Sequence, residues 1–273
     1  MRIPLGLRAA AGAGGGGGWD LDSATYTGVS YSLGTGSLGN PAGLTFDSTG
    51  DYLYETSTTG SRVWRLDMST PYDISSISGS QDYVPSLAGL PRGISVKPDG
   101  TAFFVVDSTS TDRIRRFDMS TAWDLTTSSF TSQYAALSSI DTQPSGLFIR
   151  DNGTDVYTTG YTNDIIAQWE MTTAWDITTL SHVRSFSVPS SDLNPYDVWF
   201  KPDGTRMFYL SNSSVKVVQC ELSTPWDISS ASASKSFSVS TQEANPRALT
   251  FNPSGTIMLV AGLDNDTIYE YSL

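Results

Sequence analysis

The chain has 273 residues, of which 38% are hydrophobic, and its 28 acidic residues outnumber its 16 basic ones, so its net charge is −12 and its pI is near 4.3. An acidic chain lacks the positive surface that neutralises phosphate groups, so we expect neither nucleic-acid binding nor docking or insertion at an anionic membrane. A single cysteine excludes an internal disulfide framework.

The first segment, residues 1–18, differs in composition from everything after it. A short apolar stretch is interrupted by proline, glycine and arginine, and a run of five glycines follows. The stretch is therefore too short and too broken for a secretory signal or a membrane span. One interpretation is a flexible leader. The other is an arm that docks on a partner subunit through Ile3, Leu5 and Leu7.

A short pattern that ends in an aromatic residue followed by Asp recurs along the rest of the chain. Its aromatic residues are Trp19, Tyr72, Trp123, Trp175 and Trp226. Neighbouring copies are about 51 residues apart, a period typical of stacked supersecondary units. We expect the aromatic ring to pack between neighbouring units and the Asp to cap a turn. A ligand site in every unit is the alternative.

Each unit begins with a proline and a short apolar run that ends in a tight turn. The turns close on Gly50, Gly100, Gly153, Gly204 and Gly255. Glycine suits the positive φ of a hairpin turn, so each run is predicted to be the first strand of a hairpin. A β-prone stretch, a polar loop, an alternating third strand and a Ser/Thr-rich fourth strand follow. Four antiparallel strands per repeat are the signature of a β-propeller blade.

The two ends of the chain complement each other. The last unit stops at Leu273 after three strands, whereas residues 19–33 carry the fourth-strand pattern with no first three strands before them. An N-terminal strand that completes the last blade closes the ring and removes two exposed sheet edges. The sequence therefore predicts an all-β, five-bladed propeller over residues 19–273, with residues 1–18 as an arm outside it.

Three phrases of the repeat resemble a known family. Residues 97–101 and 201–205 both read KPDGT, and residues 118–125 read DMSTAWDL. These phrases are similar to propeller repeats common in proteins of marine bacteria and their phages, and the resemblance covers residues 19–273. It implies an interaction platform rather than an enzyme. With the Gly-rich leader, it implies a phage virion protein attached by its arm. A secreted or cell-surface carbohydrate-binding propeller is the alternative.

The units differ from one another on one face of the expected propeller. That face holds the starts of the innermost strands and the loops between second and third strands. There we expect Arg92, Tyr196, Asp197 and Arg247 to ring the axial opening, with loop amides and hydroxyls around them. Such a mixture suits a sugar or a partner protein, and ordinary turn chemistry is the alternative.

Residues suited to catalysis or metal binding are sparse. Glycoside hydrolysis needs two carboxylates aimed across one bond, and no such cluster is expected at the channel. The single histidine, His182, falls on an outer strand, and Cys220 aligns with apolar residues of the other units. We therefore expect no enzyme, no metal site and no cofactor. The expected partners are other virion proteins, bound through the arm, and a host-surface glycan or protein.

Overall fold

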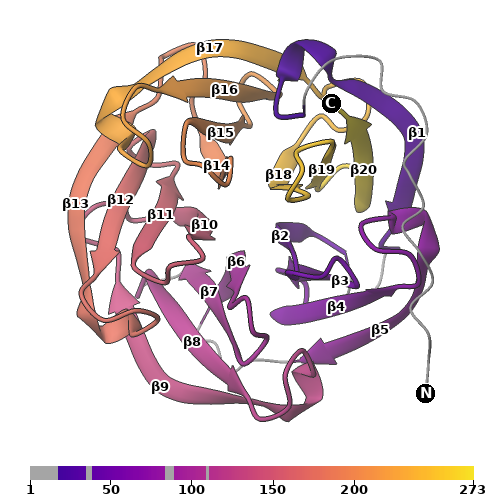
Figure 1. The fold of residues 1–273 in the computed structure, drawn as a ribbon, viewed down its shortest axis with the longest axis vertical. Helices are drawn as coiled ribbons and strands as arrows, with labels where there is room; N and C mark the ends of the chain where they lie inside the picture. Colours follow the sequence, from indigo (N-terminus) through magenta and orange to yellow (C-terminus); the bar gives the residue numbers. More distant parts are fainter. Residues whose placement is uncertain (1–17, 35–38, 84–88, 109–110) are drawn as a thin grey trace.

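The computed structural model describes residues 18–34, 39–83, 89–108 and 111–273, so the expected arm residues Ile3, Leu5 and Leu7 lie outside the described residues. Within the described ranges, twenty strands form five four-stranded antiparallel sheets. The sheets stand around a central axis as the blades of a propeller (Figure 1). The predicted five-bladed architecture is confirmed.

The strands of each blade run in order from the axis to the rim (Figure 1). Blade 1 holds β2 (Pro41–Phe46), β3 (Tyr52–Ser57), β4 (Arg62–Met68) and β5 (Ile77–Tyr83). Blade 2 holds β6 (Leu90–Val96), β7 (Ala102–Ser108), β8 (Arg113–Met119) and β9 (Ser128–Ala136). Blade 3 holds β10 (Pro144–Ile149), β11 (Asp155–Gly160), β12 (Ile165–Met171) and β13 (Leu180–Ser187). Blade 4 holds β14 (Pro195–Phe200), β15 (Arg206–Ser211), β16 (Lys216–Leu222) and β17 (Ala231–Ser238). Blade 5 holds β18 (Pro246–Phe251), β19 (Ile257–Gly262), β20 (Thr267–Ser272) and the N-terminal β1 (Thr25–Ser32).

The place of a strand in its blade decides how much of it is buried. The second strand β7 is buried along its whole length, whereas the outer strand β5 alternates between half-buried and exposed residues. The third strands, which we expect to alternate, instead bury residues on both faces, as β12 does. The reason is that each blade packs against a neighbour on either side. The apolar core of the described residues accordingly forms five clusters, each shared by two adjacent blades.

The recurring aromatic–Asp pair ties each blade to its own turn and to the blade before it. Trp123 has a φ of 69°, and its N–H donates to the carbonyl of Gly100. A Cβ on Gly100 would lie 2.2 Å from the Trp123 ring, so only glycine fits there. The Trp123 carbonyl accepts hydrogen bonds from Tyr54 and Arg65 of blade 1, at 3.1 and 2.6 Å. Asp124 caps the short 3-10 helix η3 (Leu125–Thr127).

The other blades repeat this arrangement, which confirms the structural role expected for the pair. The same N–H bond to a turn glycine is made by Trp19, Tyr72, Trp175 and Trp226. The equivalent Asp residues each cap a 3-10 helix: η1 (Leu21–Ser23), η2 (Ile74–Ser76), η4 (Ile177–Thr179) and η5 (Ile228–Ser230).

The N-terminal strand closes the ring. β1 pairs antiparallel with β20, with Thr25 opposite Ser272 and Ser32 opposite Thr267. Figure 1 shows this indigo strand beside the yellow C-terminal strand. The predicted closure is therefore confirmed, and the described edge of blade 5 is paired.

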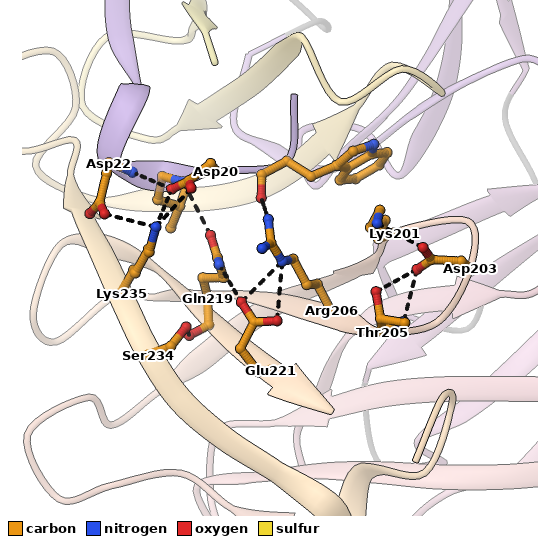
Figure 2. Close-up of polar contacts among 12 residues, drawn as sticks. Asp20, Asp22, Lys201, Asp203, Thr205, Arg206, Gln219, Glu221, Ser234 and Lys235 are labelled. Carbon is orange, nitrogen blue, oxygen red and sulfur yellow. Dashed lines mark hydrogen bonds and ion pairs between the residues drawn. The ribbon is translucent and has the colours of Figure 1, made fainter. Parts of the chain in front are cut away.

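Polar contacts clamp the same N-terminal segment to blade 4 (Figure 2). Lys235 of β17 lies 2.6 Å from Asp20 and 2.7 Å from Asp22. The hydrogen bond from Lys235 is the main reason that the pKa of Asp20 is lowered. Arg206 of β15 donates to the carbonyl of Trp19 at 2.6 Å. The segment before β1 therefore joins two blades as well as completing one.

Candidate functional site

Two sets of loops share one end of the propeller, which we call the loop face. One set leads from each outer strand to the next blade, and the other joins the second and third strands. Buried carboxyl groups tie the sets together. Asp141 accepts the backbone N–H of Gln143 at 2.7 Å and of Asn163 at 2.8 Å. Glu243 likewise accepts the N–H of Asp264 at 3.2 Å. The expectation that these loops share a face is confirmed.

Four side chains from four consecutive blades form a continuous stack on the loop face. The guanidinium of Arg92, in β6, lies 5.4 Å from the ring centroid of Tyr161, which follows β11. Tyr161 stacks on Tyr196 of β14, with centroids 5.1 Å apart and planes at 17°. The guanidinium of Arg247, in β18, lies 3.9 Å from the Tyr196 ring. We call these four residues the ladder. Attraction between each cation and an aromatic face holds its two ends.

Three of the four ladder residues are among those expected at the axial opening. The structure brings Arg92, Tyr196 and Arg247 together through Tyr161, which sequence reasoning missed. One signal could have found it, because Tyr161 is the only aromatic residue in the five loops between second and third strands. A lone aromatic in otherwise polar loops is a candidate contact residue.

Asp197, the fourth residue expected at the opening, is only 3% exposed. One carboxyl oxygen accepts the N–H of Val198 at 2.9 Å, and the other accepts the N–H of Leu249 at 2.8 Å. Burial raises the pKa of Asp197 to about 8, and hydrogen bonds from the N–H groups of Leu249, Val198 and Leu147 oppose that rise. The carboxyl group therefore links blades 3, 4 and 5 and is not presented at the surface beside the ladder.

The two guanidinium groups of the ladder are not neutralised by ion pairs. Within the described residues, every lysine and seven arginines pair with carboxylates. Arg113 has no ion pair, but its Nε donates to Thr111 at 2.9 Å. With the other described residues, Arg92 and Arg247 form neither an ion pair nor a side-chain hydrogen bond, and the Nε atom of each is buried without a partner there. Two of the three described arginines without an ion pair therefore belong to the ladder.

The opposite end of the channel, the turn face, carries the hairpin turns and the aromatic–Asp pairs. A cavity of about 660 Å³ opens there, and Phe148, Trp199 and Trp226 contribute aromatic walls. Two carboxyl groups, those of Asp47 and Asp151, also line it. Both oxygens of Asp47 accept hydrogen bonds from residues of its own turn. Burial raises the pKa of Asp151.

The remaining residues of catalytic interest lie where the sequence analysis expects them. Cys220 is fully buried, and burial raises the pKa of its thiol to about 12. His182 is exposed on β13 and lies 3.0 Å from the hydroxyl of Ser185. Among the described residues, no three His, Cys, Asp or Glu side chains gather where they could hold a metal ion. In the same ranges, no helix has the length and apolar character to span a membrane.

No family model and no curated protein matches the chain. Solved structures do. A nidogen/laminin complex aligns with a TM-score of 0.53 and 14% identity, over 85% of this chain and 79% of the other. The periplasmic gluconolactonase PpgL of Pseudomonas aeruginosa aligns with a TM-score of 0.53 and 15% identity, over 85% of this chain and 66% of the other. Kuenenia stuttgartiensis hydrazine synthase aligns with a TM-score of 0.50 and 20% identity, over 84% and 58%. At such identities the similarity shows the propeller fold alone, and that fold is shared by enzymes and by a binding complex.

Proposed function

We propose that this chain is a non-enzymatic recognition propeller of a phage particle, in which the ladder contacts a ligand on the host surface. One observation carries the recognition role. The aromatic–Asp pair occurs in every blade and serves packing, whereas the described residues form one ladder, which takes one side chain from each of four blades. Binding residues are commonly carried by loops that a rigid scaffold positions, and the loop face of this ring is such a place.

Two observations support the placement on a phage particle. Residues 97–101 and 118–125 resemble propeller repeats common in proteins of marine bacteria and their phages. The ring closes from Trp19 onward, so that residues 1–17 are not needed for closure. In this proposal, the Gly-rich segment attaches the propeller to a neighbouring virion protein. A secreted or cell-surface carbohydrate-binding propeller uses the same ladder and is the second candidate.

The non-enzymatic assignment is supported by the state of the reactive side chains. Cys220 is buried with a raised pKa, and His182 stands on the outer strand of blade 3, away from the cavity-lining residues. At the cavity, both oxygens of Asp47 are already engaged by its turn. A glycosidase needs two carboxyl groups free to act on one bond.

Binding of the purified full chain to host cells tests the recognition role. Replacing Tyr161 by alanine removes the centre of the stack, and we expect cell-bound protein to fall at least tenfold. The matched control is Tyr134→Ala. Tyr134 is 51% exposed on β9 and also carries an arginine, with Arg113 at 4.8 Å from its ring, but it lies outside the ladder. Equal cell binding by the Tyr161 variant and the wild type would contradict the proposal.

Mass spectrometry of purified particles separates the two candidates. A virion protein is recovered with the particles through density-gradient purification, in a constant ratio to the capsid protein. A secreted or cell-surface protein is instead found in the culture medium or on cells that carry no particles. Recovery of the protein only from the culture medium or from cells without particles would refute the phage assignment. The recognition role of the ladder is tested separately, by the cell-binding experiment.

A further inference from the structure

We infer that the ladder binds a saccharide that carries carboxylate groups, an inference that rests on the proposed recognition role and names its ligand. The first step is the charge distribution. The chain carries a net charge of −12. Its described lysines and most described arginines are ion-paired, but Arg92 and Arg247 are not. An acidic protein that leaves two cations unpaired at one place offers a local site for an anion.

The second step is that the nearby acids form no ion pair with these cations in the described residues. Asp141 and Asp197 are 4% and 3% exposed, and their oxygens accept backbone N–H groups. Burial raises the pKa of Tyr161, the charges of Arg92 and Arg247 both oppose that rise, and the charge of Asp141 adds to it as the smallest contribution. The two guanidinium groups therefore act on the same small region. An anion that reaches the ladder meets both of them.

The third step is the geometry of the guanidinium group. Contact with the ring of Tyr161 or Tyr196 places the guanidinium carbon of each arginine over an aromatic face and forms no hydrogen bond with its N–H groups. The Nε atoms of Arg92 and Arg247 are buried, whereas the side chains as a whole are half-buried, so the terminal N–H groups are the ones open to a ligand. A planar pair of N–H donors matches the two oxygens of a carboxylate.

The fourth step separates a saccharide from an acidic protein. Protein interfaces have an apolar centre. The large apolar side chains that are exposed in the described residues are Tyr26, Leu90, Tyr134 and Val183. Of these, only Leu90 lies in the same innermost strand as a ladder residue, and the other three are on outer strands. The ladder is instead followed by the exposed polar residues Thr162 and Asn163. Hydroxyl and amide groups beside two cations suit a hydrated, acidic sugar.

Calorimetric titration of the purified full chain with oligogalacturonate tests this ligand class. The comparison ligand is the methyl-esterified oligomer, which has the same sugar backbone without the charge. We expect the acid form to bind at least tenfold more tightly and its affinity to fall as salt is raised. Arg92→Ala and Arg247→Ala should each weaken binding about tenfold or more. Arg113→Ala is the matched control because it removes the same charge from an arginine–tyrosine stack outside the ladder, and it should change affinity less than twofold.

Three results would overturn the inference. If the methyl-esterified oligomer binds as tightly as the acid form, the ladder does not recognise the carboxylate. If poly-glutamate binds as tightly as the acid form, the ladder does not recognise the sugar. Failure of the acid form to bind, while the chain still binds host cells through Tyr161, also contradicts it and leaves the recognition role standing. Tight binding of the acid form by a chain that does not bind host cells supports the ligand class and refutes the host-recognition role.

Discussion

The two faces of the propeller are built by opposite uses of the same repeat. On the turn face, every blade places a glycine, an aromatic ring and an Asp in equivalent positions, and their hydrogen bonds are local or reach the adjacent blade. On the loop face, the equivalent positions differ from blade to blade, and four of them meet as the ladder. Repetition on one face therefore serves the packing of the ring, and divergence on the other provides a single composite site.

Carboxyl groups show the same contrast. On the turn face, Asp124 and Asp176 cap 3-10 helices, and hydrogen bonds from Thr126 and Thr178 lower their pKa values. Toward the loop face, Asp197 is buried and its pKa is raised to about 8. Glu55 of β3 is fully buried, and burial followed by the charge of Asp266, in the loop after β19, raises its pKa well above the usual value. Solvated acids stabilise the turns, whereas acids inside the blades lie in a medium that disfavours their charge.

The largest effect is expected from removing the strand that both faces depend on. Deletion of residues 1–34 removes β1 and η1 and leaves β20 as an unpaired edge. We expect loss of the cooperative thermal transition and aggregation, measured by melting and by size-exclusion chromatography. The control deletion of residues 1–17 should melt within about 2 °C of the intact chain, a change that corresponds to about 1 kcal/mol or less for a chain of this length. It should also abolish incorporation into particles. A 1–34 deletion that melts like the wild type would disprove the role of β1 in closure.

On the turn face, Trp123→Ala should cost about 3 kcal/mol in the free energy of unfolding, since it removes a partly buried ring from its glycine contact. Trp123→Tyr is the matched control, because blade 1 has Tyr72 at the equivalent position. This variant should lose much less unfolding free energy than the alanine variant, since a smaller aromatic ring fills the same place. Urea denaturation measures both. If the alanine variant loses no more unfolding free energy than a substitution at an exposed position, the aromatic–Asp pairs are not structural. They would then be candidate ligand sites.

Toward the loop face, Asp197→Asn should destabilise the fold by about 2 kcal/mol, because the amide nitrogen replaces an oxygen that accepts a backbone N–H group. Urea denaturation at pH 6 measures the loss. Asn252→Asp, by contrast, alters a turn-face residue that already accepts backbone N–H groups and should be close to neutral. An Asp197 variant as stable as the wild type would show that this carboxyl group does not link the three blades.

The smallest effect, and one of opposite sign, is expected from Glu55→Gln. Both oxygens of Glu55 are buried without a hydrogen-bond partner, so a neutral amide should stabilise the fold by about 1 kcal/mol at pH 8. The pKa of Glu55 is higher in the folded chain than its ordinary value of 4.5. Between those two values the folded state binds more protons, so the wild type should lose stability as pH rises above 4.5, by at most about 1.4 kcal/mol per pH unit. Denaturation midpoints from pH 4 to 8 test this. Parallel profiles for the variant and the wild type would refute it.

Local signals account for the parts of the fold that could be predicted. Glycine at positive φ in Gly100 and its equivalents, and the alternation of the outer strands, are properties of a few consecutive residues. The ladder is different. Tyr161 and Tyr196 stack although they belong to different blades, and their distance depends on how blades 3 and 4 pack. The orientation of Asp197 was equally hidden, because the register of β14 against β15 shifts between Pro195 and Asp197, and strand alternation does not hold across such an irregularity.

The sequence by itself determined the number of blades, their four-strand order and the closure of the last blade by residues 19–33. Period, turn chemistry and the missing fourth strand are all written in the order of the residues. Only the tertiary structure decided which of the divergent residues meet and which are buried. Arg92 and Arg247 are far apart in sequence, and they belong to one stack because the ring brings the innermost strands of neighbouring blades around a common axis. A contact set by ring closure has no signature in sequence spacing.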